Sequence, residues 1–198
     1  MEKTKLDICN MALAILGQVD LSSLQEENQR AQLCNQYYDI VRQQLLRAHD
    51  WSFAKAVEKL SLLEQDETRG LAQFVYNKPT KCLFVAKVFN KGCFEKAGHF
   101  KLEFDVKTKK EVIRTKVEDA YAEYTRDIED TTLYDSQFVE AFSAALAAKI
   151  AMSLTGSTQL YQMATQTFQY ALDNARYSNK VERLETAVFD NPYLESRG

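Results

Sequence analysis

The 198-residue chain is poor in residues that break regular structure, with six glycines and two prolines. Low turn content favours long helices. The four cysteines, Cys9, Cys34, Cys82 and Cys93, form no C-x-x-C pair, and no N-terminal hydrophobic signal segment is seen, so we expect reduced thiols. The most apolar stretch, residues 141–154, is short and contains Lys149. We therefore expect a core helix there, and no membrane partner.

Sequence patterns that carry chemistry are also missing. The chain has neither G-x-x-x-x-G-K-[ST] nor G-x-G-x-x-G, which argues against nucleotide hydrolysis. His99 follows Cys93 without further ligands at zinc-finger spacing. His49 and Asp50 could orient each other as a base dyad, but no nucleophile stands in a recognisable elbow. We predict no catalytic residue, no metal and no cofactor, and a small helical enzyme would need a convergent polar pocket that the sequence does not indicate.

Positive charge is concentrated in the middle of the chain. Between residues 78 and 116 there are eleven Lys or Arg against four Asp or Glu, although the whole chain has a net charge of -3. The lysines alternate with aromatic residues, as in nucleic-acid-binding sheets, which gives Lys107, Lys109 and Lys110 as candidates to face DNA or a partner. The alternative is that these lysines protect the edges of a sheet from pairing.

Hydrophobic periodicity changes twice along the chain. A helical stripe runs through Leu6, Cys9, Leu13 and Leu16 and a second from Ala31 to Leu45, and the helical period returns after Ser136. Between these regions, residues 82–89 are rich in β-branched and aromatic side chains, and residues 99–106 alternate as a half-buried strand does. Gly17 and Gly156 are placed to end helices.

This order predicts an α+β protein that is mainly α: an antiparallel four-helix bundle with a small antiparallel β insertion between helices 2 and 3, and an extended C-terminal arm. We expect residues 1–63 and 134–179 to form one discontinuous helical domain, 70–128 the β-rich insertion, and 180–198 the arm. The arm residues that are candidates to bind a portal or a neighbouring copy are Phe189, Pro192, Tyr193, Leu194 and Arg197.

The only tryptophan stands in "RAHDWSFAK", residues 47–55, where the helical period of the second helix stops. A large aromatic side chain at such a point typically closes a core where the chain turns away. We predict a structural core at the junction of the bundle and the insertion, formed by Trp51, Phe53, Phe138 and Phe142.

Three stretches carry a resemblance to a known family: "ICNMALAILGQ", "YYDIVRQQLLRAHDWSFAK" and "YAEYTRDIEDTTLYDSQFVEAFSAALAAKIAMSLTGS". The second closes a helix with a leucine and then W-x-F-A, here Leu46, Trp51, Phe53 and Ala54. The third follows Y-x-R-x-I-x-D, D-x-x-F-x-x-A and L-A-x-x-x-A. On these residues the chain resembles the head-to-tail adaptors of short-tailed bacteriophages, also called tail tubular protein A or tail accessory adaptor. It departs from them at Lys81, where family members often carry an acidic residue.

The resemblance implies a protein without catalytic activity in the virion, at the head-tail junction, made in the cytoplasm of the bacterial host. It implies a dodecameric ring that binds the portal protein, extends the channel for double-stranded DNA and provides the platform for a downstream tail or nozzle protein. Whether the chain alone is a monomer stays open. The alternative function is a nucleic-acid-binding module that uses the lysine-rich insertion.

Overall fold

The computed structural model describes residues 3–66, 73–92 and 97–188, with side chains described as far as Val181. The chain divides into two compact units. One consists of residues Met1–Phe53 and Glu129–Gly198 and is called the helical unit here; the other, Ala54–Ile128, is called the β unit.

Local capping signals set the ends of the helices in the helical unit. Helix α1 (Lys5–Ile15) begins with a capping box, in which the backbone N–H of Thr4 donates to Asp7 and that of Asp7 donates to the Thr4 hydroxyl. Helix α2 (Gln29–Ala48) begins at Asn28, whose side chain accepts from the Ala31 N–H at 2.9 Å. Helix α3 (Ser136–Thr155) ends at Gly156, whose φ of 64° is the left-handed conformation that glycine favours. Helix α4 (Thr158–Val188) follows at once.

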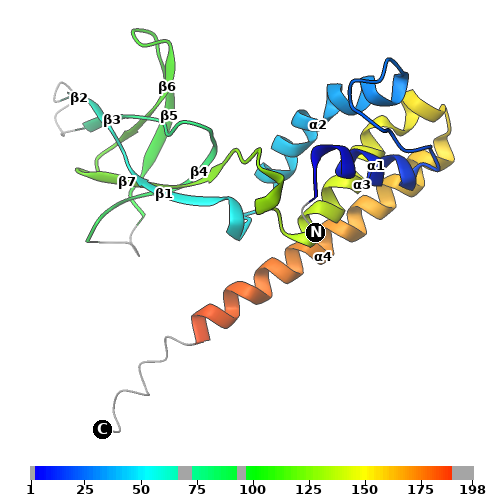
Figure 1. The fold of residues 1–198 in the computed structure, drawn as a ribbon. Helices are drawn as coiled ribbons and strands as arrows, with labels where there is room; N and C mark the ends of the chain where they lie inside the picture. Colours follow the sequence, from blue (N-terminus) through cyan, green and yellow to red (C-terminus); the bar gives the residue numbers. More distant parts are fainter. Residues whose placement is uncertain (1–2, 67–72, 93–96, 189–198) are drawn as a thin grey trace, which may run out of the picture. The chain divides into compact units, whose positions relative to one another are not determined.

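Helix α3 is the centre of the helical unit, and α1, α2 and α4 all pack against it (Figure 1). Ten of its twenty residues are buried, and four of these ten are alanines, which let neighbouring helices approach closely. By length and composition α3 is also apolar enough to cross a membrane, but most of the apolar segment is covered by the protein itself. Its hydrophobicity is accounted for by its place between three helices.

The β unit consists of two antiparallel sheets that share a core. One sheet has the strand order β1-β7-β4 (Lys55–Lys59, Ala120–Arg126, Cys82–Asn90) and the other β2-β3-β6-β5 (Leu62–Asp66, Gln73–Asn77, Lys110–Thr115, Phe100–Asp105). The core joins Val85, Val88 and Ala122 of the first sheet to Phe74 and Ile113 of the second. Two short 3-10 turns, Ser52–Ala54 and Thr131–Leu133, lie just outside the strands.

The predicted fold class is wrong, because the helices do not form a four-helix bundle that carries a small insertion. Helices α1, α2 and α4 surround α3, and a groove separates α2 from α4. The β part has two sheets and a hydrophobic core of its own. It also begins earlier than predicted: Lys55–Lys59 and Leu62–Asp66 form β1 and β2, although we expected the helical domain to extend to residue 63 and the β-rich insertion to begin at residue 70.

Residues 180–188, predicted to be an extended arm, continue α4 as helix. The apolar stripe fades there in the sequence, and α4, with 31 residues, is longer than α3, with 20. Lys180, Arg183 and Ala187 are good helix formers, and no glycine or proline interrupts the segment before Pro192. The candidate residues Phe189, Pro192, Tyr193, Leu194 and Arg197 lie outside the described residues.

The strand predicted from alternation, β5, is less buried than expected. It is an edge strand that pairs only with β6 within the described sheet. Phe100 is partly buried against the core, whereas Phe104 is 64% exposed. The alternation therefore identified the strand correctly but not the burial of its apolar face.

Candidate functional site

The four residues predicted as a structural core lie together in the helical unit. The ring centroid of Phe138 is 5.1 Å from that of Trp51, 4.9 Å from that of Phe53 and 5.9 Å from that of Phe142. Most of these rings meet edge to face, the arrangement that the quadrupole of an aromatic ring favours. Tyr134 joins the same cluster, with its ring 5.0 Å from Phe138. The cluster contains no group placed for chemistry, and its contribution is to stability.

Trp51 is fixed by its indole N–H as well as by its ring. The Nε1–H donates to the carbonyl of Leu45 at 2.9 Å, and the side chain is 2% exposed. Leu45 lies in the last turn of α2, where backbone carbonyls lack partners within the helix. The indole therefore caps the end of α2 and fills the core at the same time.

A buried amide ties α4 to the segment that follows α2. The Asn179 side-chain oxygen accepts from the backbone N–H and the hydroxyl of Ser52 at 3.0 and 2.7 Å. Its amide nitrogen lies 2.9 Å from both the Asp50 carbonyl and His49 Nε2. His49 and Asp50, considered as a dyad from the sequence, are thus part of a structural network at the end of α2.

Of the three candidate lysines, Lys107 and Lys109 lie in the turn between β5 and β6, and Lys110 is the first residue of β6. The Asp105 carboxylate accepts from the backbone N–H groups of Lys107 and Thr108, which shapes this turn. The Lys107 ammonium lies 3.9 Å from the Glu64 carboxylate, while Lys109 and Lys110 are exposed. Other basic residues nearby are paired, Lys78 with Glu111 at 2.6 Å and Arg114 with Glu103 at 3.0 Å. Three of the basic residues of this region are therefore paired with carboxylates within the β unit.

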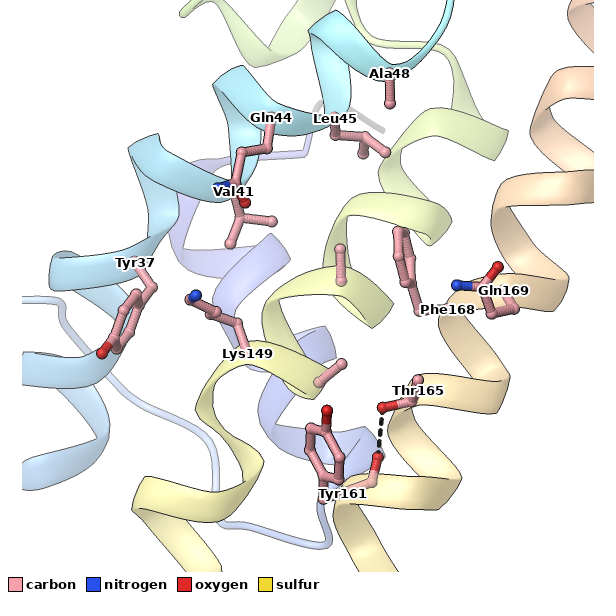
Figure 2. A pocket seen from close by; sticks show the side chains of 12 residues that line it. Tyr37, Val41, Gln44, Leu45, Ala48, Lys149, Tyr161, Thr165, Phe168 and Gln169 are labelled. Atoms are coloured by element: carbon pink, nitrogen blue, oxygen red, sulfur yellow. Dashed lines mark hydrogen bonds between the residues drawn. The ribbon is translucent and has the colours of Figure 1, made fainter.

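The helical unit contains a groove of about 590 Å³, called the α3 groove here. Its floor is α3 and its walls are α2 and α4 (Figure 2). The lining side chains come one turn apart from each helix: Tyr37, Val41, Gln44, Leu45 and Ala48 of α2, Ala145, Ala148 and Lys149 of α3, and Tyr161, Thr165, Phe168 and Gln169 of α4. Such a groove has the form that a further helix would fill.

The described lining of the α3 groove consists of uncharged side chains and one charged side chain. Lys149 is the one charged residue among the described residues that line it, and the ammonium lies 5.5 Å from the ring centroid of Tyr37 on α2 (Figure 2). Thr165 donates its hydroxyl to the Tyr161 carbonyl one turn earlier in α4 and is thereby satisfied within the helix. Among the described lining residues there is no Asp, Glu, His or Cys that could serve as a general base or nucleophile.

A second surface was missed by the sequence reasoning. Met163, Tyr170 and Tyr177 of α4 are 43%, 69% and 71% exposed, although they are large and partly apolar. They follow each other at seven-residue intervals, so they lie on one face of the helix. We call them the α4 outer stripe. The sequence contains this stripe as a second repeat of large side chains with helical spacing. The repeat falls on a different face of the helix from the buried positions Ala164, Ala171 and Ala175.

Buried titratable groups of the helical unit do not form a site. Cys9 and Cys34 are buried next to each other, and the hydrogen bond with the Cys34 thiol, together with burial, raises the pKa of Cys9 strongly. Burial also raises the pKa of the Tyr38 hydroxyl. Within the described part of the chain, no group of three His, Cys, Asp or Glu side chains is placed to hold a metal ion.

Comparison of the chain with models of protein families and with curated proteins gives no match in either case.

Proposed function

We propose that the chain is a structural adaptor of a short-tailed bacteriophage, which binds the portal protein as a ring, extends the DNA channel and supports the tail. The proposal starts from the resemblance carried by the segments around Trp51 and Phe138. In the fold these residues belong to the aromatic core of the helical unit. Their role is to stabilise the fold. This is expected if the resemblance reflects a shared structural role and not a shared catalytic activity.

The observation that supports the proposal most strongly is the α4 outer stripe. Tyr170 and Tyr177 are about 70% exposed on a helix of 31 residues. Aromatic residues are enriched in protein interfaces, and an ordered row of them in solvent marks a surface that a protein partner covers. Together with the α3 groove, the helical unit has two surfaces suited to protein contacts.

The proposal is tested by mixing the purified chain with the portal protein of its own genome. We expect a complex that elutes ahead of the portal alone in size-exclusion chromatography and appears in negative-stain images as an added ring. Tyr170→Ser combined with Tyr177→Ser should weaken assembly, whereas Gln162→Ser, an exposed change elsewhere on α4, should not. A chain that binds no portal from its own genome would refute the proposal.

A second candidate function is a sequence-independent contact with DNA through the turn between β5 and β6. In its favour, Lys109 and Lys110 are exposed, and no ion pair of either is found within the described residues. Binding that rests on phosphate contacts falls steeply with salt. We expect weak retardation of duplex DNA at low salt, lost when Lys107, Lys109 and Lys110 are all changed to glutamate. No retardation at low salt would exclude this function.

A further inference from the structure

The α4 outer stripe has no role in the fold of its own chain. The buried residues of α4, such as Ala164, Ala171 and Ala175, lie on one side of the helix, and the stripe lies roughly 120° around the helix from them. At 100° per residue, Tyr170 and Tyr177 lie roughly 140° around α4 from the face that lines the α3 groove. The stripe and the groove are thus different faces of one rigid helix, and the stripe cannot enter the groove of its own chain.

The dimensions of the α3 groove match a short length of helix. Its α2 wall runs from Tyr37 to Ala48, which is about 16 Å at 1.5 Å per residue, or three turns. Ala145 and Ala148 on its floor have small side chains, so the backbone of an incoming helix can approach α3 closely. Tyr170 and Tyr177 are about 10 Å apart along α4 and fit within that length.

The two surfaces carry opposite charges at corresponding places. Lys149 is the charged residue of the groove, and its ammonium contacts the Tyr37 ring. Asp173, exposed on α4, lies between Tyr170 and Tyr177 on the side of the stripe. Within the described part of the chain, neither Lys149 nor Asp173 makes an ion pair. A carboxylate between two aromatic residues complements a groove that combines aromatic and aliphatic side chains with one ammonium group.

We infer that the α3 groove of one copy receives the α4 outer stripe of a second copy, with Asp173 of the stripe beside Lys149 of the groove. The inference deepens the proposed function, on which it rests, by naming the surfaces through which copies meet. Because groove and stripe are different surfaces of the chain, the contact is heterologous, and each copy can engage a neighbour on either side. Repetition of such a contact produces a ring, or a helical filament if the rotation does not close.

Exchange of the two charges tests the inference on the full chain. Sedimentation velocity, up to millimolar concentration, should show self-association of the wild-type chain that either Lys149→Glu or Asp173→Lys weakens about tenfold. An equimolar mixture of the two variants should associate as the wild type does, because changed groove then meets changed stripe, and unchanged groove meets unchanged stripe. Lys91→Glu and Asp20→Lys, at exposed positions in other parts of the chain, are the matched controls and should have no effect.

A zero-length cross-link supplies the second readout. A carbodiimide joins an amine to a carboxylate in direct contact, so a mixture of ¹⁴N- and ¹⁵N-labelled wild-type chains should give a cross-linked peptide of Lys149 with Asp173 of mixed label. A chain that stays monomeric, a mixture of variants no better than each alone, or association without the mixed-label peptide would overturn the inference. If the wild type binds the portal but lacks this cross-link, only the inference fails. If the cross-link forms and no portal is bound, the proposed function fails and the self-contact stands.

Discussion

Replacement of Trp51 by alanine tests the view that the aromatic cluster holds the helical unit together. A fully buried aromatic residue removes roughly 150–250 Å² from water, which at about 25 cal/mol per Å² amounts to about 4–6 kcal/mol. The indole N–H to the Leu45 carbonyl adds about 1 kcal/mol. Partial collapse of Phe53 and Phe138 into the vacated space offsets some of this, so we expect Trp51→Ala to lower the free energy of unfolding by about 3–5 kcal/mol.

The variant Trp51→Phe separates the two contributions. It keeps an aromatic ring against Phe138 but leaves the Leu45 carbonyl without the indole donor, so the expected loss is about 1–2 kcal/mol. Urea unfolding followed by far-UV circular dichroism measures the helical unit, since all four α-helices of the described chain belong to it. Phe104→Ala, which truncates an exposed ring of the β unit, is the control and should leave this transition unchanged. A loss below about 1 kcal/mol for Trp51→Ala would refute the reasoning.

Three further predictions concern single residues. Tyr38→Phe should leave stability unchanged or raise it by about 1 kcal/mol, because the buried hydroxyl has no hydrogen-bond partner among the described residues; a clear loss in urea unfolding would show that the hydroxyl is bonded. Gly98→Ala should destabilise the β unit by about 1–3 kcal/mol, because the new Cβ would overlap Val117 Cγ2; a double-mutant cycle with Val117→Ala should recover most of the loss, and additive effects would argue against the overlap. Burial, together with the hydrogen bond that Tyr124 donates to Glu58 at 3.0 Å, raises the pKa of Tyr124 to about 12. Because the folded state holds this proton more tightly than the unfolded state, the stabilisation is complete below pH 10 and is lost as the pH rises toward 12. The alkaline loss of stability should therefore be smaller in Tyr124→Phe, and an equal loss in both chains would contradict this.

Local signals in the sequence identified the elements that depend on local interactions. Gly17 and Gly156 both have positive φ and follow α1 and α3, as their positions in the sequence predict. The alanines of α3 predicted a helix that packs closely, and α3 contacts three others. These features depend on backbone conformation and on side-chain size, which a single segment of sequence contains.

Features that depend on distant partners were predicted less well. Residues 55–66 are rich in Lys, Glu and Leu, which favour helix, yet they form β1 and β2 by pairing with β7 and β3. Strand formation follows such tertiary contacts more than local preference. The α3 groove could not be read from the sequence for a similar reason, because its lining joins α2, which ends at Ala48, to α3 and α4, which begin only at Ser136.

The pairing of β1 with β7 has a consequence for how the chain can change. Lys55 and Thr125 are direct neighbours across these antiparallel strands, so the β unit begins and ends at almost the same point in space. Paired residues in such strands are about 5 Å apart, a gap that a very short turn can bridge. Residues 54–128 are thus joined to the helices as a cassette with adjacent ends. The length and the surface of this β cassette can therefore change without moving the residues that hold α1, α2, α3 and α4 together. For the same reason, the whole cassette can be exchanged for another one.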